Sequence, residues 1–141
     1  MATYNKFNAF VEALAEKVHN LGSDTLKVYL SNATPDAAND AVKADLAEIS
    51  AGNGYTAGGN TATQTSSSQT AGVYKLVLAD PATWTAAGGS IGPFRYAVLY
   101  NDTSASDNLI AWWDYGTSIT LGAGDTFSVD FDPSTGVLTI Q

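Results

Sequence analysis

The stretch Leu109-Ile110-Ala111-Trp112-Trp113-Asp114-Tyr115 decides most of what the sequence says about the fold. Successive side chains of a β-strand point to opposite faces of its sheet, so Trp112 and Trp113 cannot lie on the same side. The alternation predicts one face made of Leu109, Ala111, Trp113 and Tyr115 and another that carries Ile110 and Trp112. Because both faces are apolar, the second must be covered by helices of the same chain or by another subunit. An exposed tryptophan that stacks on sugar is a third possibility.

Alternating apolar residues predict further short strands on either side of this one. They fall at 26–30, 73–78, 94–100, 119–121, 126–131 and 137–140. Within 94–100, the alternation puts Phe94, Tyr96, Val98 and Tyr100 on one face; within 126–131, Phe127, Val129 and Phe131 face inward. Strong turn signals such as Asp132-Pro133-Ser134-Thr135-Gly136 separate the strands. This spacing is typical of a β-sandwich or a jelly roll.

The N-terminal part has helical spacing instead. Apolar residues with a period near 3.6 predict a helix over 3–21 that ends at Gly22. His19 would then lie on its solvent face with Glu12 and Glu16. A second helix is expected from Pro35 to about Ser50, so residues 1–50 form a helix–strand–helix unit.

Residues 51–72 consist mostly of Gly, Ser and Thr, and Tyr55 is their only large side chain. Such a segment buries no core of its own, so we expect a flexible loop or an arm that pairs with a neighbouring subunit. Residues 73–141 form the β-rich part. The whole chain, 1–141, is expected to be one α+β domain: a β-rich, jelly-roll-like sandwich with two N-terminal helices.

Composition excludes several kinds of site. The 141 residues carry 6 basic and 14 acidic side chains, a formal charge of −8, with no cysteine. His19 is the only histidine and Arg95 the only arginine. Disulfides, cysteine or multi-histidine metal sites and a basic nucleic-acid-binding stripe are therefore not expected. No apolar run reaches the ~20 residues of a membrane span, and no secretory signal is visible, so synthesis in a cytoplasm is expected. Charged residues make up only 14% of the chain, which indicates a surface partly hidden in an assembly or a compositional habit of the source.

We expect no catalytic residue, metal site or cofactor. A serine hydrolase would need His19 as its base, and no Gly-x-Ser-x-Gly motif accompanies it. A glycosidase would need a carboxylate pair drawn from Asp114, Asp125, Asp130 and Asp132. Three of these lie in or beside turns, where aspartate usually caps backbone groups. Asp102 and Asp107 offer oxygen ligands, but their spacing does not match an EF-hand loop.

Three stretches resemble small virion structural proteins of tailed bacteriophages: residues 51–59, 94–102 and 112–116. The resemblance implies a non-enzymatic decoration or cement protein on the capsid surface, made in the host cytoplasm. Its partners would be the major capsid protein and further copies of itself, as a dimer or trimer. The alternative is a carbohydrate- or receptor-binding module of a phage tail or fibre.

The candidate partner-binding residues are four aromatic side chains and the single arginine: Tyr55, Trp84, Arg95, Trp112 and Trp113. Segments 51–72 and 109–113 contain no charged residue, which makes them candidate contact surfaces. Arg95 lies among apolar neighbours and needs a carboxylate or carbonyl partner, within the fold or across an interface.

Overall fold

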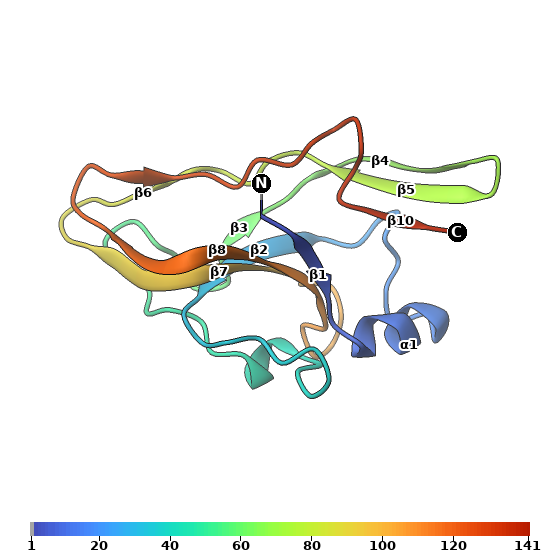
Figure 1. The fold of residues 1–141 in the computed structure, drawn as a ribbon, viewed down its shortest axis with the longest axis horizontal. Helices are drawn as coiled ribbons and strands as arrows, with labels where there is room; N and C mark the ends of the chain where they lie inside the picture. Colours follow the sequence, from blue (N-terminus) through green and yellow to red (C-terminus); the bar gives the residue numbers. More distant parts are fainter. Residues whose placement is uncertain (1) are drawn as a thin grey trace.

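The structure is a computed structural model and describes residues 2–141 (Figure 1). It is a β-rich protein with 42% of its residues in strands and one short helix. The elements in chain order are β1 (Tyr4–Lys6), α1 (Ala9–Ala15), β2 (Leu26–Ser31), the 3-10 helix η1 (Lys43–Asp45), β3 (Asn60–Thr61), β4 (Gln64–Thr70), β5 (Val73–Leu78), β6 (Trp84–Thr85), β7 (Ile91–Asn101), β8 (Leu109–Leu121), β9 (Thr126–Phe127) and β10 (Leu138–Ile140). Within residues 2–141, no helix is long and apolar enough to cross a bilayer.

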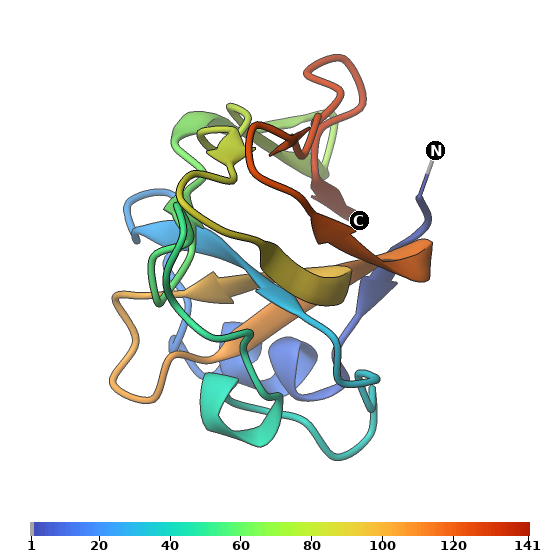
Figure 2. The ribbon, with the colours of Figure 1, turned by 90° about the vertical axis from the view of Figure 1, so that its left-hand side faces the viewer.

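A central five-stranded antiparallel sheet organises the molecule, in the order β1-β8-β7-β2-β3. Above it lie a three-stranded sheet, β10-β5-β4, and a two-stranded one, β6-β9. Figure 2 shows these small sheets on one side of the central sheet, with α1 and η1 on the other. The sheets are antiparallel and form no closed barrel, and their strand order does not show the expected jelly roll.

Each face of the central sheet carries its own apolar core. The upper core, towards the small sheets, includes Trp84, Phe94 and Leu99. The lower core is formed by Phe7, Tyr29, Leu46, Tyr96, Val98, Tyr100 and Leu109. The prediction that Trp112 and Trp113 point to opposite faces is confirmed, because Trp112 packs against the lower core and Trp113 against the upper one. Part of this second face is covered by the chain itself, because Leu46, the residue that follows η1, packs in the lower core.

The β7–β8 ladder has three irregularities, and two of them overturn the predicted alternation. Leu99 pairs with Ala111 and Tyr100 with Leu109, so Ile110 bulges out of the ladder. Ile110 therefore joins the upper core and Leu109 the lower one, the reverse of the predicted alternation.

The second irregularity lies beside Phe94. This residue pairs with Ile119, whereas Tyr96 pairs with Asp114. Phe94 consequently belongs to the upper core, while Tyr96, Val98 and Tyr100 belong to the lower one. The prediction of a single face for these four residues was wrong for Phe94.

The two predicted N-terminal helices were also wrong in extent. Residues 4–6 pair with β8 as a strand, and α1 is followed by Lys17 in the left-handed region, with φ 66°. Residues 35–50 contain only η1. The Asp45 carboxylate accepts hydrogen bonds from the backbone N–H groups of Ala41 and Val42, at 3.0 Å each. Such local side-chain bonds favour turns over a continuous helix.

The segment 51–72 is not a loop throughout, because it contains β3 and β4. β4 pairs with β5 of the same chain, and its Ser, Thr and Gln side chains are largely solvent-accessible. A short polar strand is a common way to form a sheet edge that does not aggregate. Of the predicted strand 126–131, only Thr126–Phe127 pairs, but Phe127, Val129 and Phe131 do face inward.

Candidate binding groove

The sandwich is closed along one side and open along the other. On the closed side, the chain passes directly from β3 of the central sheet to β4 of the upper sheet. On the open side, the edge strands are β1 and β10. The first and last strands of the chain thus border the same opening (Figure 1).

The edge of β1 exposes backbone hydrogen-bonding groups. Phe7 donates its backbone N–H to the carbonyl of Ile110 at 3.2 Å, which makes this a hydrogen-bonded pair of the β1–β8 ladder. In an antiparallel ladder such pairs alternate with pairs that do not bond to each other. Tyr4 and Lys6 therefore direct their backbone N–H and C=O groups away from β8, towards the opening.

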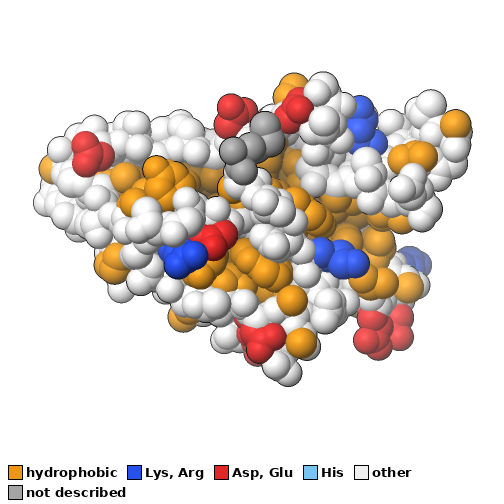
Figure 3. All heavy atoms as spheres, viewed as in Figure 1, with side chains coloured by type: hydrophobic (Ala, Val, Ile, Leu, Met, Phe, Trp, Pro, Cys, Tyr) orange, Lys and Arg blue, Asp and Glu red, His pale blue; other side chains and the backbone are white. Residues whose placement is uncertain are grey.

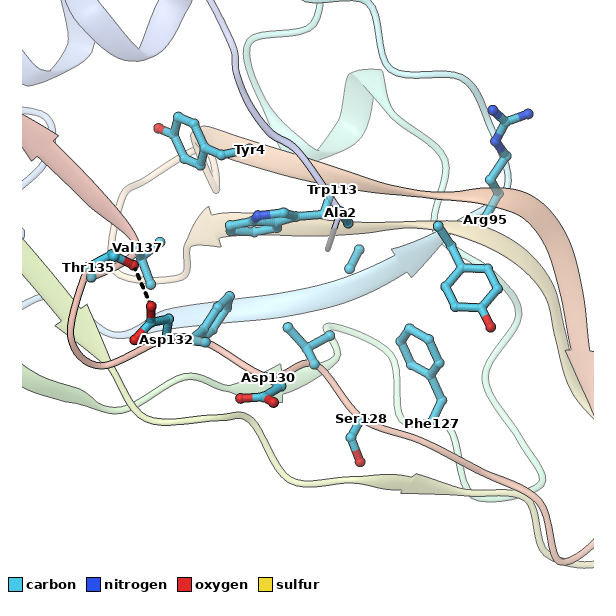
Figure 4. Close-up of a pocket in the computed structure, with 15 residues that line it drawn as sticks. Ala2, Tyr4, Arg95, Trp113, Phe127, Ser128, Asp130, Asp132, Thr135 and Val137 are labelled. Atoms are coloured by element: carbon cyan, nitrogen blue, oxygen red, sulfur yellow. Dashed lines mark hydrogen bonds between the residues drawn. The ribbon is translucent and has the colours of Figure 1, made fainter.

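A hollow of about 630 Å³ lies in this opening, between the central sheet and residues 127–137. Its volume is in the range of small-molecule and peptide-side-chain sites. The side chains that line it are mostly aromatic or aliphatic: Tyr4, Ala97, Trp113, Tyr115, Phe127, Val129, Phe131 and Val137. Figure 4 shows Trp113 on the sheet side and Phe127 on the opposite wall.

A second hollow of about 690 Å³ continues the first along α1 and β10. The two share four lining residues: Tyr4, Thr135, Gly136 and Val137. We call the two together the open-side groove. Figure 3 shows hydrophobic side chains gathered in a hollowed band across this face, with a few charged side chains among them. Of the large exposed apolar side chains, Val11, Tyr115 and Ile140 line the groove, whereas Val18 does not.

Three of the four carboxylates near the groove have structural partners. Asp114 accepts two hydrogen bonds from Arg95, and Asp132 accepts hydrogen bonds from Ser134 that hold the pKa of its carboxyl below the ordinary value. Asp125 accepts the backbone N–H of Gly122 within a turn. Asp130 is exposed to solvent and is one of the residues that line the first hollow. The groove therefore presents rings and open backbone groups, an arrangement that supports binding.

The five predicted partner-binding residues do not form one site. Trp113 lines the groove, and so does the stem of Arg95, although its guanidinium points away from the hollow in Figure 4. Trp112 is on the other face, with its ring centroid 4.5 Å from that of Phe7. Tyr55 and Trp84 are buried, at 3% and 1% exposure, with ring centroids 6.5 Å apart. Both belong to the upper core: the Tyr55 hydroxyl accepts the backbone N–H of Leu30 in β2, and Trp84 starts β6, which pairs with β9.

Sequence reasoning missed most of the groove. Tyr115 and the inward-facing residues of 127–131 were visible as alternating apolar positions, but nothing marked them as a shared surface. Tyr4 fell within a predicted helix, so its place on a sheet edge had no signal in the sequence.

The structure also places His19 differently from the prediction, which put this residue on the solvent face of a helix. It is buried, at 4% exposure, because the chain leaves the helix before reaching it.

Asp102, one of the two possible calcium ligands, pairs with Lys27 at 2.9 Å. Among residues 2–141, no group of three or more His, Asp or Glu side chains is placed to hold a metal ion.

Comparison of the chain with models of protein families, with curated proteins and with solved structures finds no match.

Proposed function

We propose that the chain is a non-enzymatic virion structural protein of a tailed bacteriophage, a decoration or cement protein that binds the capsid through its open-side groove. One observation carries the proposal: a continuous apolar groove lies between two unpaired sheet edges, on a protein with few charged residues. The resemblance of residues 51–59, 94–102 and 112–116 to small phage virion proteins gives the class of particle.

The physical basis is interface burial. Tyr115 is 56% exposed, and aromatic side chains of this kind are the usual anchors of protein interfaces. The free backbone groups of Tyr4 and Lys6 can pair with an extended segment of a partner, as in strand addition. A copy that binds the major capsid protein in this way, alone or as a dimer or trimer, would bridge neighbouring subunits on the capsid surface. A sandwich open on one side serves this role with or without jelly-roll strand order.

Two groove variants and one matched control test the proposal. Tyr115→Ser removes an exposed ring, and Val129→Lys puts a charge on the groove wall. Val18→Ser makes the same kind of change at an exposed apolar residue outside the groove, where 39% of the side chain is accessible. The measurement is co-sedimentation of each folded variant with head shells of the phage that encodes the chain.

We expect the two groove variants to weaken binding by about tenfold or more, the loss of a typical hot-spot contact, and Val18→Ser to bind like the parent. Equal binding by all three would place the interface elsewhere. Failure of the parent chain itself to bind head shells would remove the decoration role.

A second candidate is a carbohydrate- or receptor-binding module of a phage tail or fibre. The observation that favours it is the presence of Tyr4, Trp113 and Tyr115 in one hollow, because sugars stack on aromatic rings. A glycan array distinguishes the two. Hits that disappear in Tyr115→Ser favour the carbohydrate-binding module, whereas an array without hits removes it.

A further inference from the structure

Asn101, the last residue of β7, connects three parts of the chain through one buried side chain. Its Oδ1 accepts the backbone N–H groups of Thr103 at 2.9 Å and Ser104 at 3.2 Å. Its Nδ2 lies 2.6 Å from Oδ2 of Asp24 and 3.1 Å from Nδ1 of His19. Two backbone donors at Oδ1 fix the orientation of the amide, because a flipped amide would place N–H groups against N–H groups.

This orientation also fixes the tautomer of His19. Both hydrogens of the Asn101 amide point outward, one to Asp24 and one to the ring, so Nδ1 must be an acceptor. The ring proton of neutral His19 is then on Nε2, which is buried without a hydrogen-bond partner among the described residues. The site thus accommodates His19 only in its neutral form.

The same amide organises the connection between β7 and β8. Ser104 Oγ donates to the carbonyl of Asn101 at 2.9 Å and accepts the backbone N–H of Asn108 at 2.8 Å. The connection is also attached to the start of β2, because Thr25 donates its backbone N–H to Thr103 Oγ1 at 2.9 Å. Asn101 therefore holds residues 102–108 in place from one end.

Two influences on His19 oppose each other. Burial disfavours the imidazolium, and the carboxylate of Asp24, the charged group that faces the ring, favours it; burial is the larger, so the pKa of His19 is lowered from its ordinary 6.5. The remaining neighbours are the ring of Phe10 from α1, 5.2 Å away between centroids, and the amide of Asn101 from β7.

We propose that His19, Asn101 and Asp24 form an acid-sensitive latch on the β7–β8 connection. Protonation of Nδ1 would place an N–H group against the Asn101 amide, two donors 3.1 Å apart in the closed state. The ring then moves away from Asn101 into solvent, the amide loses its fixed position, and residues 102–108 are released from this end. This inference is independent of the proposed function, because it concerns neither the groove nor a partner.

The direction of the pH effect follows from the lowered pKa of His19. An open state that binds the proton with an ordinary pKa of 6.5 is favoured over the closed state as the pH falls below that value. Its population rises about tenfold for each pH unit until the lowered pKa of the closed state is reached. Above the ordinary value the latch stays closed.

The test is a pH titration of the ¹⁵N-labelled chain by NMR, from neutral to mildly acidic pH. His19 is the only histidine, so its ring signals need no assignment by mutation. We expect the Asn101 side-chain amide and the backbone amides of Thr103 and Ser104 to shift with the His19 titration. Their hydrogen exchange, corrected for intrinsic pH dependence, should accelerate about tenfold per pH unit.

His19→Gln supplies the control, because its side-chain oxygen can accept from Asn101 but does not titrate. We expect this variant to show no acid transition at Thr103 and Ser104. The proposal is overturned if the parent chain shows no change at these amides while His19 titrates, or if the transition persists in His19→Gln. The parent titration decides the matter alone if the variant does not fold.

Discussion

Arg95 donates two hydrogen bonds to the carboxylate of Asp114, from Nε at 2.7 Å and from Nη2 at 2.8 Å, at the point where β7 and β8 lose register. On the β7 side only Arg95 separates Phe94 from Tyr96, whereas on the β8 side residues 115–118 separate their two partners. The same carboxylate accepts the backbone N–H of Gly116 at 2.7 Å. The arginine that needed a partner in the sequence thus finds it within the fold, where it fixes an irregular part of the ladder.

Arg95→Lys is expected to loosen residues 115–118, because a lysine cannot make the paired contact of a guanidinium. Hydrogen exchange of the Gly116 amide should become faster, with only a small decrease in Tm, since the pair is partly exposed to solvent. Arg95 lowers the pKa of Asp114, so the stabilisation is present above the ordinary value of 3.8 and is lost as the pH falls through the lowered one. Unchanged Gly116 exchange in Arg95→Lys would contradict this role.

Gly59→Ala is expected to destabilise the chain by about 3 kcal/mol or more, through overpacking and backbone strain together. Gly59 has a φ of 69°, and a Cβ there would overlap the carbonyl of Val28 in β2. Gly124→Ala is the matched control: its φ is 94°, but no atom lies within 4 Å of the added Cβ. Only the strain remains there, so a loss of about 1–2 kcal/mol is expected. Chemical denaturation measures both, and equal losses would show that the close approach of Gly59 to β2 is unimportant.

Tyr55→Phe is expected to cost about 1–3 kcal/mol of unfolding free energy. The Tyr55 hydroxyl accepts the backbone N–H of Leu30 at 3.0 Å and donates to Glu48 Oε1 at 2.7 Å. Leu30 is fully buried, so its N–H would remain without a partner. Tyr74→Phe is the control, since its hydroxyl bonds Ser67 where water can replace it, and a change within about 0.5 kcal/mol is expected. Equal effects of the two substitutions would show that the buried bond is not special.

Tyr4 is expected to make the groove sensitive to alkali. Burial raises the pKa of its phenol to about 12 from an ordinary 10.0. A raised acid pKa contributes stability below pH 10, and this contribution is lost as the pH rises towards 12. Tyr4→Phe should therefore flatten the alkaline part of the curve of Tm against pH. A curve identical to that of the parent would mean that Tyr4 ionises as easily in the folded chain as in the unfolded one.

Alternation in the sequence was sufficient to locate most strands and to separate Trp112 from Trp113. The period of two reports directly which way neighbouring side chains point, so it survives wherever the ladder is regular. It failed at Ile110 and at Phe94, where one strand holds extra residues and the parity shifts. A bulge is set by the register in which two strands pair, and the apolar pattern of one strand alone carries no information about that register.

The helical pattern near the N-terminus failed for a different reason. The apolar period predicted that residues 4–6 continue the helix, but they pair with β8, a strand far along the chain, and tertiary contacts override local propensity. The place of Tyr4 at the groove follows from that pairing, whereas His19 is buried because α1 ends at Ala15. The candidate site could be predicted only in part. Trp113 could be placed because it lies on a regular strand. The opposite wall could not, because residues 127–137 reach the groove by an irregular path that has no period in the sequence.

The position of β1 has a consequence for the order of folding. β7 and β8 are joined by a short connection and can pair early, whereas Asn5 and Trp112, which meet across β1 and β8, are 107 residues apart in the chain. Contacts between distant residues form late, because the intervening chain must be ordered first. The floor of the groove is therefore completed only when nearly all of the chain is in place. A partner that binds the groove as proposed would therefore select completely folded molecules, and assembly on this surface would exclude incompletely folded copies without a separate check.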